Sequence, residues 1–518
     1  MGAKGQYAKR VLSMAAAAVL TVTSFSVFTP AKAEQVEAKP QYPFMDTALT
    51  FEERAADLVS RLTLDEKISQ LGRTAAAVPR LGLAKYDYWN EALHGIQNGT
   101  GEGTSFPQPL SMAQTWDTAF IEEVASAIAD ECRGHNQPAE LGGRGRGLTY
   151  WCPTINLDRS PLWGRTTEAY GEDAFVAGML ASAFVDGMQG DADENGGYLK
   201  TVATIKHYAL NNHENGRGST SSDTSEADIR DYYTKVFRYV VENTEVASLM
   251  SAYNAVNNTP SSGNTFQLMT LLRKTFGFTG FVTSDCGAIG NLKDSQNWKP
   301  TMDNITLAPG KELSAYVDAD GVVTKEGSVA LAMMAGCDMD CGEVYPSNAK
   351  KAYNQGLVTE SQIEINVYNS LLSRFKLGEF DPDEKVEYRS DAYSFANAVE
   401  NDEHRALADE AANKSVVLLK NDGILPLDAS KLTKVVVVGD QVEVCDLGNY
   451  SGKPQKKNLI SMYDGISDYL FTHNKNVKLD KVTSFGENGA IKAEDQELIK
   501  AADAVIVLGS DTHADSSE

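Results

Sequence analysis

The chain has 518 residues, enough for two or three domains. Its composition is that of a globular protein, 42% hydrophobic and 23% charged, with a formal net charge of -24. Nucleic acids and anionic membranes attract basic surfaces, so this charge argues against both as partners.

The first 33 residues form a segment of their own. Lys4, Lys9 and Arg10 make a basic start, and the apolar run "VLSMAAAAVLTVTSFSVF" follows. The "AKA" of residues 31–33 has the form of a cleavage site, so residues 1–33 are predicted to be a signal peptide and the protein to be secreted. A membrane anchor is the alternative, but the apolar run is short and diluted by Ser and Thr. After cleavage we expect no membrane association.

Six cysteines are too few for a disulfide scaffold in a chain of this length. Cys337 and Cys341 have the spacing of metal ligands, but no second pair or His cluster accompanies them, so we expect no metal site. Free buried thiols and one bridge involving Cys286 both remain open.

Helical and strand patterns alternate along the chain from residue 52. Apolar spacing predicts a helix over 52–62, and Thr63 with Glu66 predicts a capping box for a second helix. Short β-rich runs follow at 148–157, 202–209, 247–254 and 280–286, with a weaker one at 331–339. Helical patterns lie between several of them, at 172–188 and 226–243. This alternation predicts parallel βα units.

Each β-rich run ends in polar or reactive side chains. They are Asn156 and Asp158, Lys206 and His207, Tyr253 and Asn254, Asp285, and Asp338. A (β/α)8 barrel places its active site at the carboxyl ends of its strands, whereas a doubly wound sheet gathers its site at one switch point. The pattern therefore predicts a TIM-like (β/α)8 barrel catalytic domain over residues 34–395.

The character of the sequence changes between residues 380 and 405, where an acidic, weakly periodic stretch is predicted to be a linker. A helix running into a strand follows at 404–427, and buried-strand patterns recur at 434–440 and 501–511. We predict a second α/β sandwich domain over 396–518. Because it stops a few residues past a strand, we expect this domain to be truncated and the chain to be a fragment.

The chemistry-bearing residues are carboxylates, aromatics and cations at strand ends. The sequence contains no Walker A, HExxH or GxSxG motif. Paired carboxyl groups with hydrogen-bonding side chains suit glycoside hydrolysis, which needs neither a metal nor an organic cofactor.

Several segments together resemble glycoside hydrolase family 3. "GFVTSDCGAI" is similar to the nucleophile motif of that family, and "RLGLAKYDYWNEALHG" to its early substrate-binding motif. The segments "SPLWGRTTEAYGED", "TIKHYALNN", "SLMSAYNAVN", "AGCDMDCG", "VVLLKNDGILPL" and "LGNYSGKP" also resemble family segments, in family order. The resemblance covers residues 42–518 and implies a TIM-like barrel followed by an α/β sandwich.

Within the family the chain resembles the β-xylosidase branch. "WNEALHG", the Cys after Asp285 and "AGCDMDCG" carry this likeness, since β-glucosidases usually have Trp after the nucleophile. "KHYALNNHENG" departs from the "KHFPGHG" segment of the N-acetylglucosaminidase branch and so disfavours that activity.

The resemblance also implies roles for individual residues. Asp285 matches the nucleophile, although alone it would be interpreted as a helix cap. Glu91 matches the acid that holds hydroxyl groups of the terminal sugar. The remaining substrate-binding matches are Arg165, Lys206, His207, Tyr253, Arg217 and Trp151, the last as a stacking wall.

The acid/base is expected in the second domain, where "GSDTHADSSE" resembles the start of the family motif. Glu518 is the best match, with Asp511 and Asp515 as alternatives. The sequence thus predicts a secreted, retaining exo-glycosidase, foremost a β-xylosidase acting on xylo-oligosaccharides. An α-L-arabinofuranosidase, a β-glucosidase and an inactive carbohydrate-binding protein are the alternatives, and the oligomeric state stays open.

Overall fold

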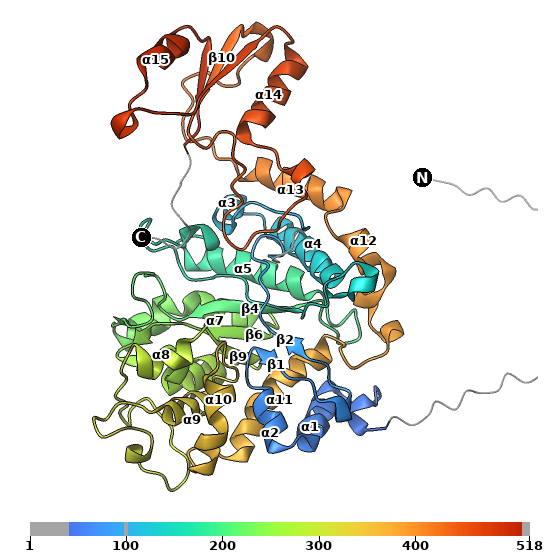
Figure 1. Ribbon diagram of the computed structural model, residues 1–518, viewed down its shortest axis with the longest axis vertical. Helices are drawn as coiled ribbons and strands as arrows, with labels where there is room; N and C mark the ends of the chain where they lie inside the picture. Colours follow the sequence, from blue (N-terminus) through green and yellow to red (C-terminus); the bar gives the residue numbers. More distant parts are fainter. Residues whose placement is uncertain (1–40, 98–101, 510–518) are drawn as a thin grey trace, which may run out of the picture. The chain divides into compact units, whose positions relative to one another are not determined.

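The computed structural model describes residues 41–97 and 102–509 (Figure 1). The chain divides into two units, Met1–Gln41 and Tyr42–Glu518, and the fold below is that of the second. The predicted signal peptide and the candidate acid/base Glu518 lie outside the described residues. No helix in the described ranges is long and apolar enough to cross a membrane.

Helices make up most of the regular structure. Up to residue 300 they are α1 (Phe51–Arg61), α2 (Leu64–Ser69), α3 (Pro109–Ala113), α4 (Thr118–Asn136), α5 (Ala174–Gln189), α6 (Glu226–Asp228), α7 (Lys235–Asn243) and α8 (Ala288–Asp294). After it they are α9 (Lys325–Ala335), α10 (Val344–Asn354), α11 (Glu360–Lys376), α12 (Phe395–Ala398), α13 (Asp402–Ser415), α14 (Met462–His473) and α15 (Ala493–Lys500). Two π-helical stretches, Ile229–Tyr233 and Phe266–Thr275, precede α7 and β9.

The strands form several small sheets. They are β1 (Thr74–Ala75), β2 (Tyr86–Asp87), β3 (Thr149–Tyr150), β4 (Val202–Tyr208), β5 (Ser221–Ser222), β6 (Ser248–Ser251), β7 (Ala255–Val256), β8 (Thr259–Pro260), β9 (Phe281–Ser284), β10 (Lys434–Val438), β11 (Lys478–Val482) and β12 (Ala504–Val507). The sheet that matters most for function is parallel, in the order β3-β4-β6-β9.

The parallel pairing continues past β9 through single bridges. Thr283 pairs with Met339, and Asp340 pairs with Gly72, each in parallel orientation. In Figure 1, β4, β6 and β9 lie among the surrounding helices, with α5 packed on β4 and α11 on β9. Helices thus cover a parallel sheet, which makes the unit α/β.

Local sequence signals explain the helix starts. Thr63 and Glu66 form the predicted capping box of α2, in which each side chain accepts from the other residue's backbone N–H. A second capping box, Thr50 with Glu53, opens α1. These reciprocal bonds satisfy backbone donors that would otherwise lack partners at a helix start.

The weaker strand predicted over 331–339 is wrong for most of its length. Residues up to Ala335 are the end of α9, and only Met339 makes a strand-like bridge. Ala, Leu and Met are good helix formers, and the cap from Thr324 starts the helix ahead of this run. Gly336 ends it in the left-handed conformation.

The second sheet is parallel in the order β11-β10-β12, and the side chains of residues 435–438 in β10 are buried. The strand predicted within 404–427 is absent from the described structure, because residues 416–420 follow α13 without ladder pairing. Val416 and Leu419 are 78% and 92% exposed. A β-branched, apolar run forms a strand only when a neighbouring strand supplies the ladder.

The predicted linker 380–405 is packed. Asp381 forms a buried ion pair with Arg54 of α1 and accepts a hydrogen bond from Tyr198 at 2.7 Å. Three 3-10 turns follow, and Tyr388 is buried between them and Tyr198. The acidic, weakly periodic composition predicted a linker. Composition alone does not show that Asp381 forms an ion pair with the buried Arg54.

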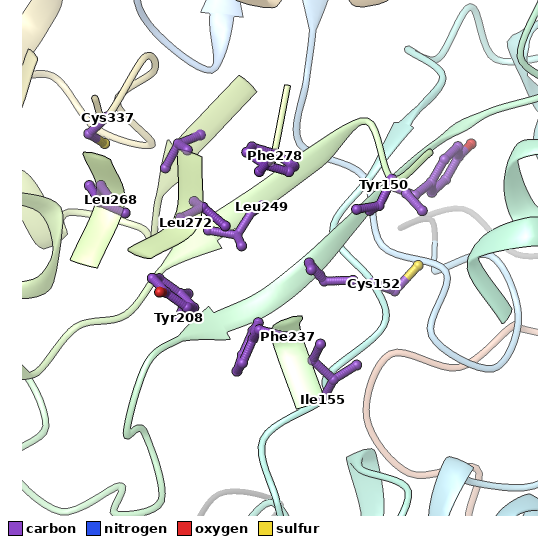
Figure 2. Close-up of a cluster of buried hydrophobic side chains, with 14 of the residues drawn as sticks. Tyr150, Cys152, Ile155, Tyr208, Phe237, Leu249, Leu268, Leu272, Phe278 and Cys337 are labelled. Atoms are coloured by element: carbon purple, nitrogen blue, oxygen red, sulfur yellow. The ribbon is translucent and has the colours of Figure 1, made fainter. Parts of the chain in front are cut away.

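The main core lies between the parallel sheet and its helices (Figure 2). Leu249 of β6 is fully buried, and the rings of Tyr208 and Phe237 meet edge to face with centroids 5.1 Å apart. These contacts hold β4 and β6 rigidly, so side chains at the ends of the strands are held by a packed scaffold.

Candidate active site

The parallel strands bring several predicted site residues together. Lys206 and His207 lie in β4, while Asp285 follows β9 directly. The backbone N–H of Asp285 donates to the carbonyl of Ser251 in β6 at 3.1 Å, so neighbouring strand ends set its position. His207 Nε2 lies 3.8 Å from Asp285 Oδ2, which places β4 and β9 residues in one site.

Asp285 presents one free carboxylate oxygen. Its Oδ1 accepts from the backbone N–H of Cys286 at 2.7 Å. Its Oδ2 is buried and has no hydrogen-bond partner among the residues that the structure describes. Burial raises the pKa of this carboxyl group, and Arg165, Arg217 and Lys206 act against that rise. A buried, unpaired oxygen held rigidly by its own backbone suits a nucleophile.

His207 is held as a neutral imidazole. Asn156 Oδ1 accepts the backbone N–H of His207 at 2.8 Å and lies 3.2 Å from its Nδ1, while Arg165 Nη1 lies 3.2 Å from its Nε2. An amide oxygen only accepts and a guanidinium only donates, so the proton is on Nδ1. Burial, with Arg165 and Lys206 nearby, lowers the pKa of His207 well below its usual value.

Arg165 is fixed by a two-pronged ion pair. Its Nε and Nη2 donate to the two carboxylate oxygens of Glu168 at 2.8 and 2.6 Å, and both residues are buried. Thr154 also donates to Glu168, at 3.2 Å. Planar bidentate pairs fix direction as well as charge, so Glu168 aims the guanidinium at His207. Neither Asn156 nor Glu168 was predicted as a site residue, although both lie in the quoted motifs or at a strand end.

Glu91 and Lys206 form a buried ion pair. Lys206 Nζ lies 3.0 Å from Glu91 Oε2, and Trp89 Nε1 donates to Glu91 Oε1 at 3.3 Å. Burial raises the pKa of Glu91, and the ammonium of Lys206 acts against it. Four polar groups predicted from three motifs therefore form one hydrogen-bonding surface beside Asp285: Glu91, Arg165, and the neighbours Lys206 and His207.

A disulfide and two tryptophans form an apolar wall. Cys286 and Cys341 are joined, which decides between the two cysteine hypotheses, and the other four cysteines are free. Trp151 packs against this disulfide and is 1% exposed. Trp89 stacks on Trp151 with ring centroids 5.8 Å apart and is 39% exposed, so Trp89 presents the more accessible face.

Tyr253 and Arg217 lie together at the half-buried edge of the site. The Arg217 guanidinium lies 4.6 Å from the centroid of the Tyr253 ring and pairs with Glu214. Burial and then the Asp285 carboxylate raise the pKa of the Tyr253 hydroxyl, which therefore stays protonated near that acid.

Tyr450 also contributes to the site, although it lies in the segment between β10 and α14. Its ring centroid lies 4.6 Å from Lys206 Nζ and 5.8 Å from the Arg165 guanidinium. Its motif was matched to the family, but it was not predicted as a site residue because no periodicity links it to the strands of the other sheet. Asp338, predicted at the same strand-end edge, instead pairs with Arg273 at 2.7 Å and accepts from Asn369.

Two family models match the chain. Residues 87–370 match the model of the Glycosyl hydrolase family 3 N terminal domain, and residues 416–518 match that of the Glycosyl hydrolase family 3 C-terminal domain. These two matches support a two-domain α/β fold.

The chain is similar to curated proteins and to solved structures. It is 33% identical to "Probable beta-D-xylosidase 7" of Arabidopsis thaliana over 91% of its own length, and 34% identical to "Beta-xylosidase/alpha-L-arabinofuranosidase 1" of Medicago sativa subsp. varia over 80%. It spans 60% and 52% of these two relatives. A solved "GH3 exo-beta-xylosidase (XlnD) in complex with xylobiose aziridine activity based probe" matches 92% of the chain and 59% of that structure, with a TM-score of 0.79 and 30% identity. The chain belongs to glycosyl hydrolase family 3.

Proposed function

We propose that this protein is a retaining exo-glycosidase, and specifically a β-xylosidase that releases terminal xylose from xylo-oligosaccharides. The unpaired, buried Oδ2 of Asp285 is the observation that carries this proposal. It lies 3.8 Å from the neutral imidazole of His207, and the charges of Arg165, Arg217 and Lys206 favour its ionised form. Such an oxygen is free to form a bond to a bound sugar.

The proposed reaction has two steps. Asp285 Oδ2 attacks the anomeric carbon and forms a glycosyl ester, while a carboxylic acid of the second domain gives its proton to the departing glycosidic oxygen. That carboxylate then takes a proton from water, which attacks the anomeric carbon, frees xylose and restores the Asp285 carboxylate. Glu518, outside the described residues, is the proposed acid/base.

The surrounding residues are proposed to bind the terminal sugar. Glu91 accepts hydrogen bonds from the sugar hydroxyl groups. Lys206, Arg165 and the hydroxyl of Tyr253 donate to them. The Nδ1 proton of His207 is donated to Asn156, so His207 is assigned to positioning the sugar and excluding water. Trp151, Trp89 and Arg217 complete the walls, where aromatic faces stack on sugar rings.

Xylose is the favoured sugar because the Cys286–Cys341 disulfide and Trp151 close the wall directly beside Asp285. A pentopyranose lacks the hydroxymethyl group for which a hexose needs room. The relative named as both a β-xylosidase and an α-L-arabinofuranosidase favours arabinofuranosides as a second substrate class. Glucosides are the third.

We also propose that the parallel sheet is part of a TIM-like barrel. The bridges from β9 to Met339 and from Asp340 to Gly72 support closure of this kind. We place the catalytic domain at residues 34–395, the sandwich domain at 396–518, and the mature protein outside the cell on the evidence of residues 1–33.

Covalent labelling tests the proposal. The chain is incubated with a 2-deoxy-2-fluoro-xyloside carrying a good leaving group, and labelled peptides are identified by mass spectrometry. Label is expected on Asp285, with none on Asp285→Ala, while the control Asp294→Asn at the exposed end of α8 labels like the wild type. Rates on nitrophenyl xyloside, arabinofuranoside and glucoside then rank the sugars.

Three results would count against this proposal. Undiminished label on Asp285→Ala would remove Asp285 from the nucleophile role. A dominant glucoside rate would overturn the choice of sugar. Binding of xylose by a wild-type chain that takes up no label would favour the inactive carbohydrate-binding alternative.

A further inference from the structure

The segment that carries Tyr450 is docked tightly on the parallel-sheet part of the chain. We call residues 446–458 the Tyr450 loop. His94 holds it at two points, because its Nε2 lies 2.7 Å from the carbonyl of Asn449 and its backbone N–H donates to the carbonyl of Tyr450 at 3.4 Å. The backbone N–H of Glu102 donates to the Lys453 carbonyl at 2.8 Å.

Glycine makes this close docking possible. A Cβ added to Gly452 would lie 2.1 Å from the carbonyl oxygen of Thr104, and one added to Gly95 would lie 2.6 Å from the nitrogen of Gly452. Two backbones thus meet where side chains have no room. The loop is therefore seated in one position, provided that its far end is also held.

Glu400 holds the far end of the loop. Its Oε1 accepts from the backbone N–H of Gln455 at 2.8 Å and from Asn458 Nδ2 at 2.5 Å. The residue is 4% exposed and has a φ of 50°, a left-handed conformation that is rare outside glycine. A buried acid in an unfavourable backbone conformation is kept there by its surroundings.

Those surroundings are centred on Glu131 of α4. Its Oε1 accepts from the backbone N–H of Glu400 at 3.0 Å, and lies 3.1 Å from His404 Nδ1. Its Oε2 accepts from the backbone N–H of Thr104 at 2.8 Å. Glu131 is fully buried, so one carboxylate fixes both Glu400 and the Thr104 backbone against which Gly452 packs.

We infer that Glu400 is a positioning residue that acts on sugar binding through the Tyr450 loop. The path runs from Glu131 to Glu400, from Glu400 to Gln455 and Asn458, and along the loop to the ring that covers Lys206 and Arg165. This inference rests on the proposed function, because Lys206 and Arg165 are there assigned to sugar hydroxyl groups.

The same path predicts which kinetic quantity changes. Tyr450 covers the hydroxyl-binding cations, whereas no hydrogen bond or ion pair joins the loop to Asp285 among the residues that the structure describes. Loss of Glu400 leaves the backbone N–H of Gln455 and the side-chain amide of Asn458 without their acceptor, so the loop gains freedom at its far end. Binding of the sugar should weaken, and the rate of attack by Asp285 in the bound complex should stay close to that of the wild type.

The experiment compares Glu400→Ala and Glu400→Gln with Glu403→Ala in the full chain. Glu403 is three residues away, exposed in the first turn of α13, and serves as the matched control. Hydrogen exchange of residues 446–458, the Kd for xylose, and the concentration dependence of labelling by the fluoro-xyloside are measured for each. Glu400→Gln keeps an amide oxygen that can accept, so it should lie between Glu400→Ala and the wild type.

Glu400→Ala is expected to speed exchange in the loop and to raise the Kd for xylose by about tenfold, with the saturating labelling rate within about twofold. On a Tyr450→Ala background the same change should add no further loss of affinity, since both act through one ring. Unchanged loop exchange, or faster exchange with unchanged Kd, would overturn the inference. An additive double variant would do so as well.

The two proposals fail in different ways. If the wild type neither binds xylose nor takes up label, the proposed function fails, and faster loop exchange in Glu400→Ala still shows that Glu400 anchors the loop. If the wild type binds and labels normally and Glu400→Ala matches it in exchange and Kd, only the positioning role fails.

Discussion

Replacing Lys206 by Met should destabilise the protein strongly, because it leaves a buried acid without its partner. Lys206 is 2% exposed and Glu91 is 7% exposed, and their charged atoms lie 3.0 Å apart. Met has a similar straight chain but no charge, so the substitution removes the ammonium group with little change in packing.

The size of the effect follows from the geometry. Two unit charges 3.0 Å apart attract by about 5 kcal/mol at an effective dielectric constant of about 20. Breaking a buried pair from one side typically costs about 3–5 kcal/mol. We therefore expect Lys206→Met to lower the free energy of unfolding by about 4 kcal/mol at pH 8. The loss should be smaller at pH 5, because the lone Glu91 can then take up a proton.

Urea unfolding followed by circular dichroism measures this change. Lys350→Met is the matched control, because its ion pair with Asp65 has a 2.7 Å contact but both side chains are exposed. That variant should lose less than about 1 kcal/mol. The double variant Lys206→Met with Glu91→Gln should lose much less than the sum of its single variants, since no charge is left unpaired.

Two results would refute this reasoning. A loss below about 1 kcal/mol for Lys206→Met would mean that the pair is screened by water in spite of its burial. A double variant whose loss equals the sum of the single losses would mean that the two side chains do not interact across the 3.0 Å contact.

Three further predictions concern stability. Burial raises the pKa of Asp340 from 3.8 to about 6. The stabilisation that the protonated Asp340 gives to the folded state is therefore fully present below pH 4 and is lost as pH rises through 6. Asp340→Asn should therefore gain about 3 kcal/mol relative to wild type between pH 4 and pH 8 in urea unfolding, and a flat difference would contradict this. The Cys286–Cys341 bridge spans 55 residues, so replacing both by Ser should cost about 4 kcal/mol, and a loss below about 1 kcal/mol would exclude the chain-entropy explanation. Leu249→Ala should cost about 2–5 kcal/mol by thermal unfolding. The control Leu162→Ala, at a side chain that is 79% exposed, should cost less than about 0.5 kcal/mol. Equal losses would contradict the packing of Figure 2.

Much of the fold could be predicted because its signals are local. The α2 capping box depends on two side chains three residues apart, and β4 was located to within one residue because its β-rich run is continuous over Val202–Tyr208. The two strand predictions that failed, over 331–339 and within 404–427, depended on residues whose state is set by neighbours in space. Ala335 continues a helix begun at Thr324, and Leu419 has no strand to pair with in the described structure.

The candidate site divides in the same way. Asp285, Glu91, Lys206, His207 and Arg165 could be selected from motifs, and the structure gathers them. Tyr450 could not be placed by periodicity, because its position depends on a loop docked by backbone contacts from residues far away in the sequence. Glu168 and Asn156 act on other side chains, so only their hydrogen bonds show what they do.

The Cys286–Cys341 bond makes the site sensitive to where the protein is produced. A cell interior rich in glutathione keeps thiols apart, whereas an oxidising compartment joins them. Chains from the two sources would share one sequence and differ in the residue next to Asp285, which would carry either a covalent strut or a loose thiol. Two laboratories that use different expression hosts would therefore study two forms of the chain, and a thiol count on each batch would distinguish them before any assay.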